Sequence, residues 1–110
     1  MPERIQLRRT KGWRMPANTV NVARPGKWGN IFSVAPTLKP GAKVAGGQYV
    51  AVPTVEDAVE CFRLWLVENP DGRALAEAAG QELRGKNLAC WCKPGDLCHA
   101  DVLLEVANAG

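Results

Sequence analysis

The second half of the chain carries apolar residues at helical spacing. From Thr54 onward, the apolar side chains recur at positions i, i+1, i+4, i+7 and i+8, which lie on one face and predict one amphipathic helix. These positions are Ala58, Val59, Phe62, Trp65 and Leu66. The TVED sequence at residues 54–57 is a capping-box pattern, and Asn69-Pro70 supplies the stop signal. We therefore expect a helix between Thr54 and Asn69.

Two further helices are predicted after it. Asp71 is a suitable cap for a helix over residues 72–84, and Gly85 suits the left-handed residue that follows many helices. A last helix is expected over residues 97–109, capped by Asp96. Its core-facing stripe consists of Leu97, Ala100, Leu103, Leu104 and Ala107.

Short alternating or apolar runs predict strands before the first of these helices and between the second and the third. The clearest runs are TVNVAR at 19–24 and NLACW at 87–91, with shorter runs at 5–9 and 49–53. Residues 33–48 are rich in proline and glycine, which predicts one long surface loop. Strands that alternate with helices indicate an α/β protein, a small single-domain Rossmann-like layered fold over residues 1–110 with a mainly parallel sheet.

In such a fold, two loops would emerge at the same edge of the sheet. PGKWGN follows the strand at 19–24, and CKPGDLCH follows the strand at 87–91. If these two strands are parallel, both loops lie at the carboxyl ends of the strands, where open α/β sheets bind their ligands. We therefore expect residues about seventy positions apart in the sequence to form one cavity.

The first loop has side chains that suit a phosphorylated ligand. Arg24 and Lys27 offer positive charge for phosphate, and Asn30 offers a donor and an acceptor. Trp28 offers a flat face for a base, and Gly29 lets the backbone approach a ligand closely. Burial of Trp28 in the core stays open as the alternative, because tryptophan is often largely buried.

The second loop gathers three thiols and the only histidine of the chain. Cys90, Cys92, Cys98 and His99 are the ligand types of a zinc site, although Cys-x-Cys is not the usual Cys-x₂₋₄-Cys spacing. A reactive Cys98 thiol near a helix N-terminus is a second interpretation. In the third, Cys92, His99 and Asp101 line a ligand pocket, and in the fourth Cys90 and Cys98 belong to the core. The last two are compatible, and we favour their combination.

Charge and composition narrow the class of partner. The net charge is +3, and residues 4–27 hold seven Lys and Arg with no Asp or Glu. This stretch indicates an anionic partner. A pI of about 8.8 is below the range typical of a dedicated nucleic-acid domain, so nucleic acid is unlikely. No apolar run reaches the roughly 20 residues of a membrane span, and no secretory signal precedes the domain. We expect a cytoplasmic protein with reduced cysteines and no membrane partner.

Three segments resemble a known family. GWRMP, TVNVARPGKWGNIF and LRGKNLACWCKPGDLCHADVLLEVAN are similar to the small bacterial and phage family called domain of unknown function 4326. The resemblance implies a compact α/β domain that is often encoded by phages. Other small Rossmann-like phage proteins sequester cyclic or ADP-ribose-derived immune signals, which makes an anti-defence role an expectation by analogy.

Together these observations favour a binder of a phosphorylated, nucleotide-derived small molecule that does not turn its ligand over. Its expected ligand-binding residues are Arg24, Lys27, Trp28, Gly29, Asn30, Cys92, His99 and Asp101. One alternative is an enzyme that acts on a nucleoside or nucleotide N-glycosidic bond through Asp101 or Cys98. Another is a zinc-stabilised nucleic-acid module. No cofactor is expected, although a zinc ion is kept as an alternative. A homo-oligomer is also kept as an alternative.

Overall fold

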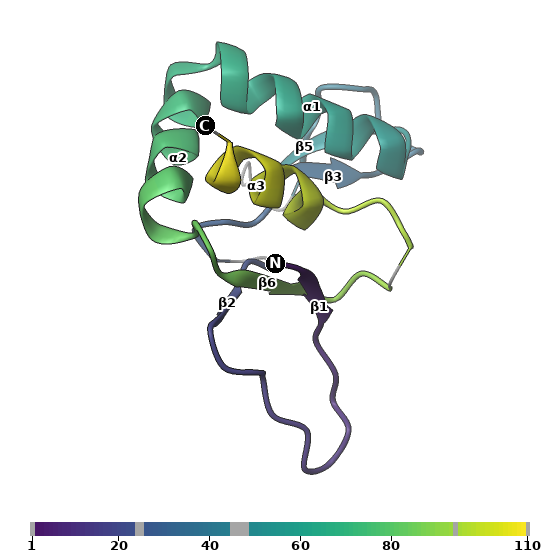
Figure 1. Ribbon diagram of the computed structural model, residues 1–110. Helices are drawn as coiled ribbons and strands as arrows, with labels where there is room; N and C mark the ends of the chain where they lie inside the picture. The colour runs from purple at the N-terminus through teal and green to yellow at the C-terminus, as the bar shows by residue number, and fades with distance from the viewer. Residues whose placement is uncertain (1, 24–25, 45–48, 94, 110) are drawn as a thin grey trace.

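The computed structural model describes residues 2–23, 26–44, 49–93 and 95–109. These residues form a mixed α/β protein with three helices and two small sheets (Figure 1). In chain order the elements are β1 (Arg4–Gln6), β2 (Thr19–Asn21), β3 (Phe32–Val34), β4 (Lys43–Val44), β5 (Tyr49–Val52), α1 (Val55–Glu68), α2 (Pro70–Glu82), β6 (Asn87–Cys90) and α3 (His99–Asn108).

The principal sheet is parallel and has the strand order β1–β6–β2. In its register, Ile5 and Asn21 are both paired with Ala89, one on each side of the central strand. Two further backbone hydrogen bonds extend this pairing, from the N–H of Leu7 to Cys90 and from the N–H of Val22 to Ala89. The predicted parallel arrangement of the strands at 19–24 and 87–91 is therefore confirmed, and their carboxyl ends share one edge.

The prediction of one long loop at 33–48 is wrong. Strands β3 and β4 overlap this segment and pair with β5, the first in parallel and the second antiparallel. Backbone bonds continue the pairing, from Ala35 N–H to Val52 and from Ala51 N–H to Ala42. Short edge strands tolerate proline and glycine nearby because only one side of the strand must pair. Residues 45–48 lie outside the described residues.

Local capping chemistry sets the helix boundaries. The Thr54 side chain accepts a hydrogen bond from the Asp57 N–H, and its hydroxyl donates to the Asp57 carboxylate, so the cap predicted at Thr54 is confirmed. Helix α2 begins at Pro70, earlier than predicted, because Asn69 rather than Asp71 caps it and proline is favoured in a first helical turn. Gly85 has a φ of 77°, in the left-handed region as expected.

Helix α3 begins later than predicted. Its N-cap residue is Cys98, and Asp96 lies in the loop before it. Leu97 is consequently outside the helix and half exposed, so it does not join the core-facing stripe. Figure 1 shows α3 between the β1–β6–β2 sheet and α1, where its apolar face is buried from both sides. None of the helices in the described segments is long and apolar enough to cross a bilayer.

Candidate functional site

A cavity of about 260 Å³ opens at the carboxyl end of β6. Its thiol-bearing wall comes from the end of β6 and the segment that joins β6 to α3, and the loop after β2 adds Ala23 and Asn30. The apolar part of the lining comes from β3 and the first half of α1. It consists of Phe32, Val34, Val55, Ala58 and Val59. The cavity therefore lies where the parallel topology predicts a ligand site.

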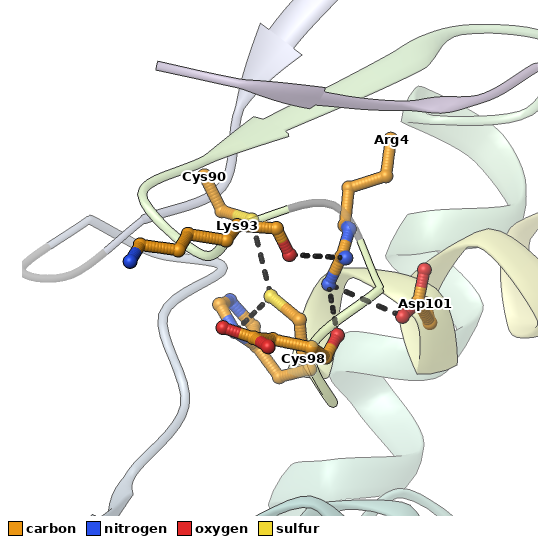
Figure 2. A network of polar contacts seen from close by, with 7 residues as sticks. Arg4, Cys90, Lys93, Cys98 and Asp101 are labelled. Atoms are coloured by element: carbon orange, nitrogen blue, oxygen red, sulfur yellow. Dashed lines mark hydrogen bonds and ion pairs between the residues drawn. The ribbon is translucent and has the colours of Figure 1, made fainter. Parts of the chain in front are cut away.

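Three cysteines meet in this wall. The sulfur atoms of Cys90, Cys92 and Cys98 all lie within 4.8 Å of one another. Figure 2 shows the contact between Cys90 and Cys98, whose sulfur atoms are 3.1 Å apart. Cys90 and Cys98 are almost fully buried, whereas Cys92 is partly exposed. All four cysteines of the chain are free thiols in the structure, with Cys61 away from this cluster on α1.

His99 lies beside the cluster with its ring fixed. Its Nε2 is 2.8 Å from the Val22 carbonyl oxygen, and because a carbonyl can only accept, Nε2 carries the hydrogen. Nδ1 faces the Cys98 sulfur at 3.8 Å, and the Phe62 ring packs edge-on against the imidazole. This arrangement ties α3 to the end of β2 and sets one ring nitrogen against a thiol.

The thiols differ in their electrostatics. The hydrogen bonds from the Cys90 thiol and the Ala100 N–H lower the pKa of Cys98 to about 3 against the opposing effect of burial. The same hydrogen bond and burial raise the pKa of Cys90 far above its usual value. Burial, and then the neighbouring Cys98, raise the pKa of Cys92 to about 11. The arrangement favours one thiolate stabilised by two protonated thiols.

Arg4 fixes the loop that carries this cluster. Its guanidinium donates to the carbonyl oxygens of Lys93 at 2.9 Å and Asp96 at 2.8 Å, and it lies 3.3 Å from a carboxylate oxygen of Asp101 (Figure 2). The side chain of Arg4 is only 11% exposed. Partial burial raises the pKa of Asp101 more than the charge of Arg4 lowers it. One side chain from β1 thus organises the whole segment between β6 and α3.

The loop itself is closed by a tight turn. The Asp96 N–H donates to the Lys93 carbonyl at 3.0 Å, and Gly95 has a φ of 90°. Only glycine adopts this backbone conformation without strain, so Gly95 suits its position in the turn. The turn reverses the chain, and Cys98 therefore lies beside Cys90 at the end of β6.

Comparison with known proteins identifies the family. The family model for a domain of unknown function (DUF4326) matches residues 5–109. The chain belongs to this family. It is also 29% identical over 89 residues to the "uncharacterized 12.4 kDa protein in nrdA-td intergenic region" of Enterobacteria phage T4, an alignment that covers 81% of this chain and 67% of the phage protein. No solved structure matches. The resemblance seen in the sequence is confirmed, and the phage relative agrees with it.

Three of the expected ligand-binding residues line the cavity of this DUF4326 chain, namely Asn30, Cys92 and His99. Asn30 is buried and uses both ends of its amide in the fold. It donates to the Ala58 carbonyl at 3.0 Å and accepts from the Phe32 N–H at 2.8 Å. Its structural role is to hold the loop after β2 against α1 and β3.

Other expected residues of the DUF4326 chain lie elsewhere. Trp28 is 7% exposed and packs in the hydrophobic core, because the loop turns its ring inward and leaves no face free for a base. Lys27 pairs with Glu82 of α2 at 2.9 Å. Gly29 is buried and does not line the cavity. Asp101 faces Arg4 instead of the cavity. Arg24 lies outside the described residues.

The structure also adds a residue that the sequence reading did not select. Trp91 directly follows β6, lines the cavity and is 48% exposed. The guanidinium of Arg9 lies 4.8 Å from the centroid of its ring, a cation–π distance. The sequence signal for Trp91 was its position at the carboxyl end of a predicted strand, between Cys90 and Cys92.

Proposed function

We propose that this DUF4326 chain binds a nucleotide-derived small molecule in the cavity at the end of β6. The observation that carries the proposal is the half-exposed Trp91 on the cavity wall with the Arg9 guanidinium stacked on its ring. Trp91 supplies the aromatic face that was expected from Trp28, and Arg9 supplies the cation that was expected from Arg24 and Lys27.

The wall chemistry suits a flat, weakly polar group. Apolar side chains of β3 and α1 line the cavity together with the thiols, and the half-exposed ring of Trp91 is also part of the lining. A volume of about 260 Å³ lies just below the roughly 300–1,000 Å³ typical of small-molecule sites. The cavity thus accommodates one base or nucleoside. In a cyclic or ADP-ribose-type ligand, the phosphates would extend past Trp91 towards Arg9.

Position in the fold supports the same class of ligand. A site at the carboxyl ends of parallel strands is the usual ligand position in Rossmann-like α/β proteins, and α3 begins at this cavity with a residue that lines it. We further propose a sequestering role, such as phage anti-defence against a nucleotide immune signal in the cytoplasm. The phage relative supports the phage setting of this role. Of the two residues considered for catalysis, Asp101 does not line the cavity, whereas Cys98 does, so the enzyme alternative would depend on Cys98.

Binding is tested by calorimetric titration with a panel of AMP, ADP-ribose and cyclic dinucleotides. Trp91→Ala should weaken the ligand that binds by about 5- to 100-fold, because stacking on an aromatic ring contributes roughly 1–3 kcal/mol per base. Leu64→Ala is the matched control, because Leu64 is equally exposed at 48% but lies outside the cavity. Equal affinity in the Trp91→Ala protein, or no binding by any member of the panel, contradicts the proposal.

Arg9 is tested separately. Arg9→Gln should weaken a phosphorylated ligand but leave the corresponding nucleoside unchanged, because the guanidinium acts on the phosphate. Arg8→Gln removes the same charge from the neighbouring exposed residue and should have little effect. Chromatography of the recovered ligand separates the alternatives, since a converted nucleotide would identify an enzyme and exclude simple sequestration.

A further inference from the structure

The strongest unassigned feature is the contact among Cys90, Cys92 and Cys98. Apolar side chains in a packed core come into contact at about 4.0–4.5 Å between heavy atoms. The sulfur atoms of Cys90 and Cys98 are 3.1 Å apart, well inside that range, and Cys92 completes a group within 4.8 Å. Packing alone does not require three thiols at one point, particularly when one of them is partly exposed to the cavity.

We propose that Cys90, Cys92 and Cys98 bind one zinc ion, with the fourth coordination position directed into the cavity. Zinc is held by thiolates at about 2.3 Å, which places tetrahedral sulfur ligands about 3.8 Å apart. The three sulfurs reach that spacing from their present positions with shifts of roughly 1 Å. This inference is independent of nucleotide binding, although the two sites share a wall.

The fold holds the three ligands before any metal arrives. Cys90 is the last residue of the central strand, and Cys98 is the N-cap of α3. The loop between them is fixed by the Arg4 bonds to Lys93 and Asp96. Cys92 follows Cys90 by two residues and lies on the same cavity wall. Preorganised ligands of this kind reduce the ordering cost of metal binding.

Charge balance supports a three-thiolate site. Three thiolates on a divalent zinc ion leave one net negative charge, which is unfavourable in a partly buried position. Arg4 lies next to the cluster, and its charge interacts with both Cys98 and Cys92. Its side chain is 11% exposed, so this interaction is only weakly screened by water. Arg4 therefore supplies the compensating charge.

All three cysteines line the cavity. His99 is not counted as a ligand, because only the three sulfur atoms form the group within 4.8 Å. A zinc ion with three protein ligands keeps a fourth position for water or an external ligand. In this protein that position would face the volume between the thiols and β3. A nucleotide bound there could reach the ion through a ring nitrogen or a phosphate oxygen.

The proposal is tested by elemental analysis of the full chain, purified with a reducing agent and without chelators. The expected result is one zinc ion per chain, with a cobalt-substituted form that shows thiolate-to-metal charge-transfer absorption. Cys92→Ser should lower zinc affinity more than about 100-fold, since even outer-shell partners of metal ligands contribute about 10–100-fold. Cys61→Ser is the matched control, because Cys61 lies outside the cluster, and it should retain the full metal content.

Cys92→His distinguishes loss of a zinc ligand from a folding defect. It replaces one zinc ligand with another, so it should bind zinc better than Cys92→Ser does. Alkylation followed by mass spectrometry gives a second measurement, in which zinc should protect three thiols but not Cys61. A metal-free wild type that does not take up added zinc overturns the proposal. So does a Cys90–Cys98 disulfide in the reduced preparation, or equal zinc loss in the Cys61→Ser and Cys92→Ser proteins. Each of these results leaves the nucleotide titration to be judged independently.

Discussion

Two glycines of the same helix should respond in opposite directions to the same substitution. Gly72 lies in the first turn of α2 and is buried against α1. A Cβ atom added there would lie 1.9 Å from the Trp65 carbonyl oxygen and 2.9 Å from Cδ2 of its ring. Gly80 is near the other end of α2, and an added Cβ meets nothing within 4 Å. Both positions therefore share a propensity gain, but only Gly72 has a steric cost.

The magnitudes follow from these distances. Replacing glycine by alanine in a helix is favourable by about 0.8–1.0 kcal/mol. A contact of 1.9 Å with a backbone oxygen cannot be relieved by rotating a side chain, so α1 and α2 must move apart, which costs about 1–3 kcal/mol or more. We expect Gly72→Ala to lower the free energy of unfolding by up to about 2 kcal/mol, net of propensity. Gly80→Ala should raise it by about 0.5–1 kcal/mol.

Urea unfolding followed by circular dichroism measures both variants. For a chain of this size, 1 kcal/mol corresponds to roughly 4–8 °C in Tm, so the two proteins should differ clearly. An unchanged m-value would show that the variants differ in stability and not in the compactness of the unfolded state. Equal stabilisation by both substitutions would refute the close approach of α1 and α2 at Trp65.

Two further substitutions test the organisation of the site. Asn30→Ala removes both hydrogen bonds of a buried amide and should cost about 2–4 kcal/mol in urea unfolding, while Lys27→Gln, which breaks only an exposed ion pair with Glu82, should stay within about 1 kcal/mol of wild type. Arg4→Gln removes the bonds that hold the loop between β6 and α3 and should increase amide exchange in residues 91–97, whereas equal exchange rates in the two proteins would contradict this positioning role.

Helices were predictable because their signals are local. The apolar stripe and the Thr54 capping box place α1 within a residue of its observed ends. The start of α3 was less predictable, because Asp96 is a better cap than Cys98 by residue type alone. The main-chain carbonyl of Asp96 is bound by Arg4, ninety-two positions earlier, and this tertiary contact keeps Asp96 in the loop.

The edge of the sheet that bears the site was also predictable, but the side chains that face the cavity were not. Parallel pairing of β2 with β6 follows from alternation and topology, and it brings Asn30 and His99 to one cavity. The sequence predicts Trp91 as the last residue of a strand and Trp28 as part of a loop, yet β6 ends at Cys90 and Trp91 directly follows it. Their burial differs because the loop after β2 folds over the core, whereas the segment after β6 turns outwards at Trp91.

The middle strand of the principal sheet comes from late in the chain. Strands β1 and β2 each pair with β6, and each leaves the ribosome more than sixty residues before β6 does. During synthesis, therefore, β1 and β2 wait for the strand that joins them, while β3, β4, β5, α1 and α2 are already complete. A ribosome that stalls before Asn87 would release a chain without its principal sheet and its thiol cluster.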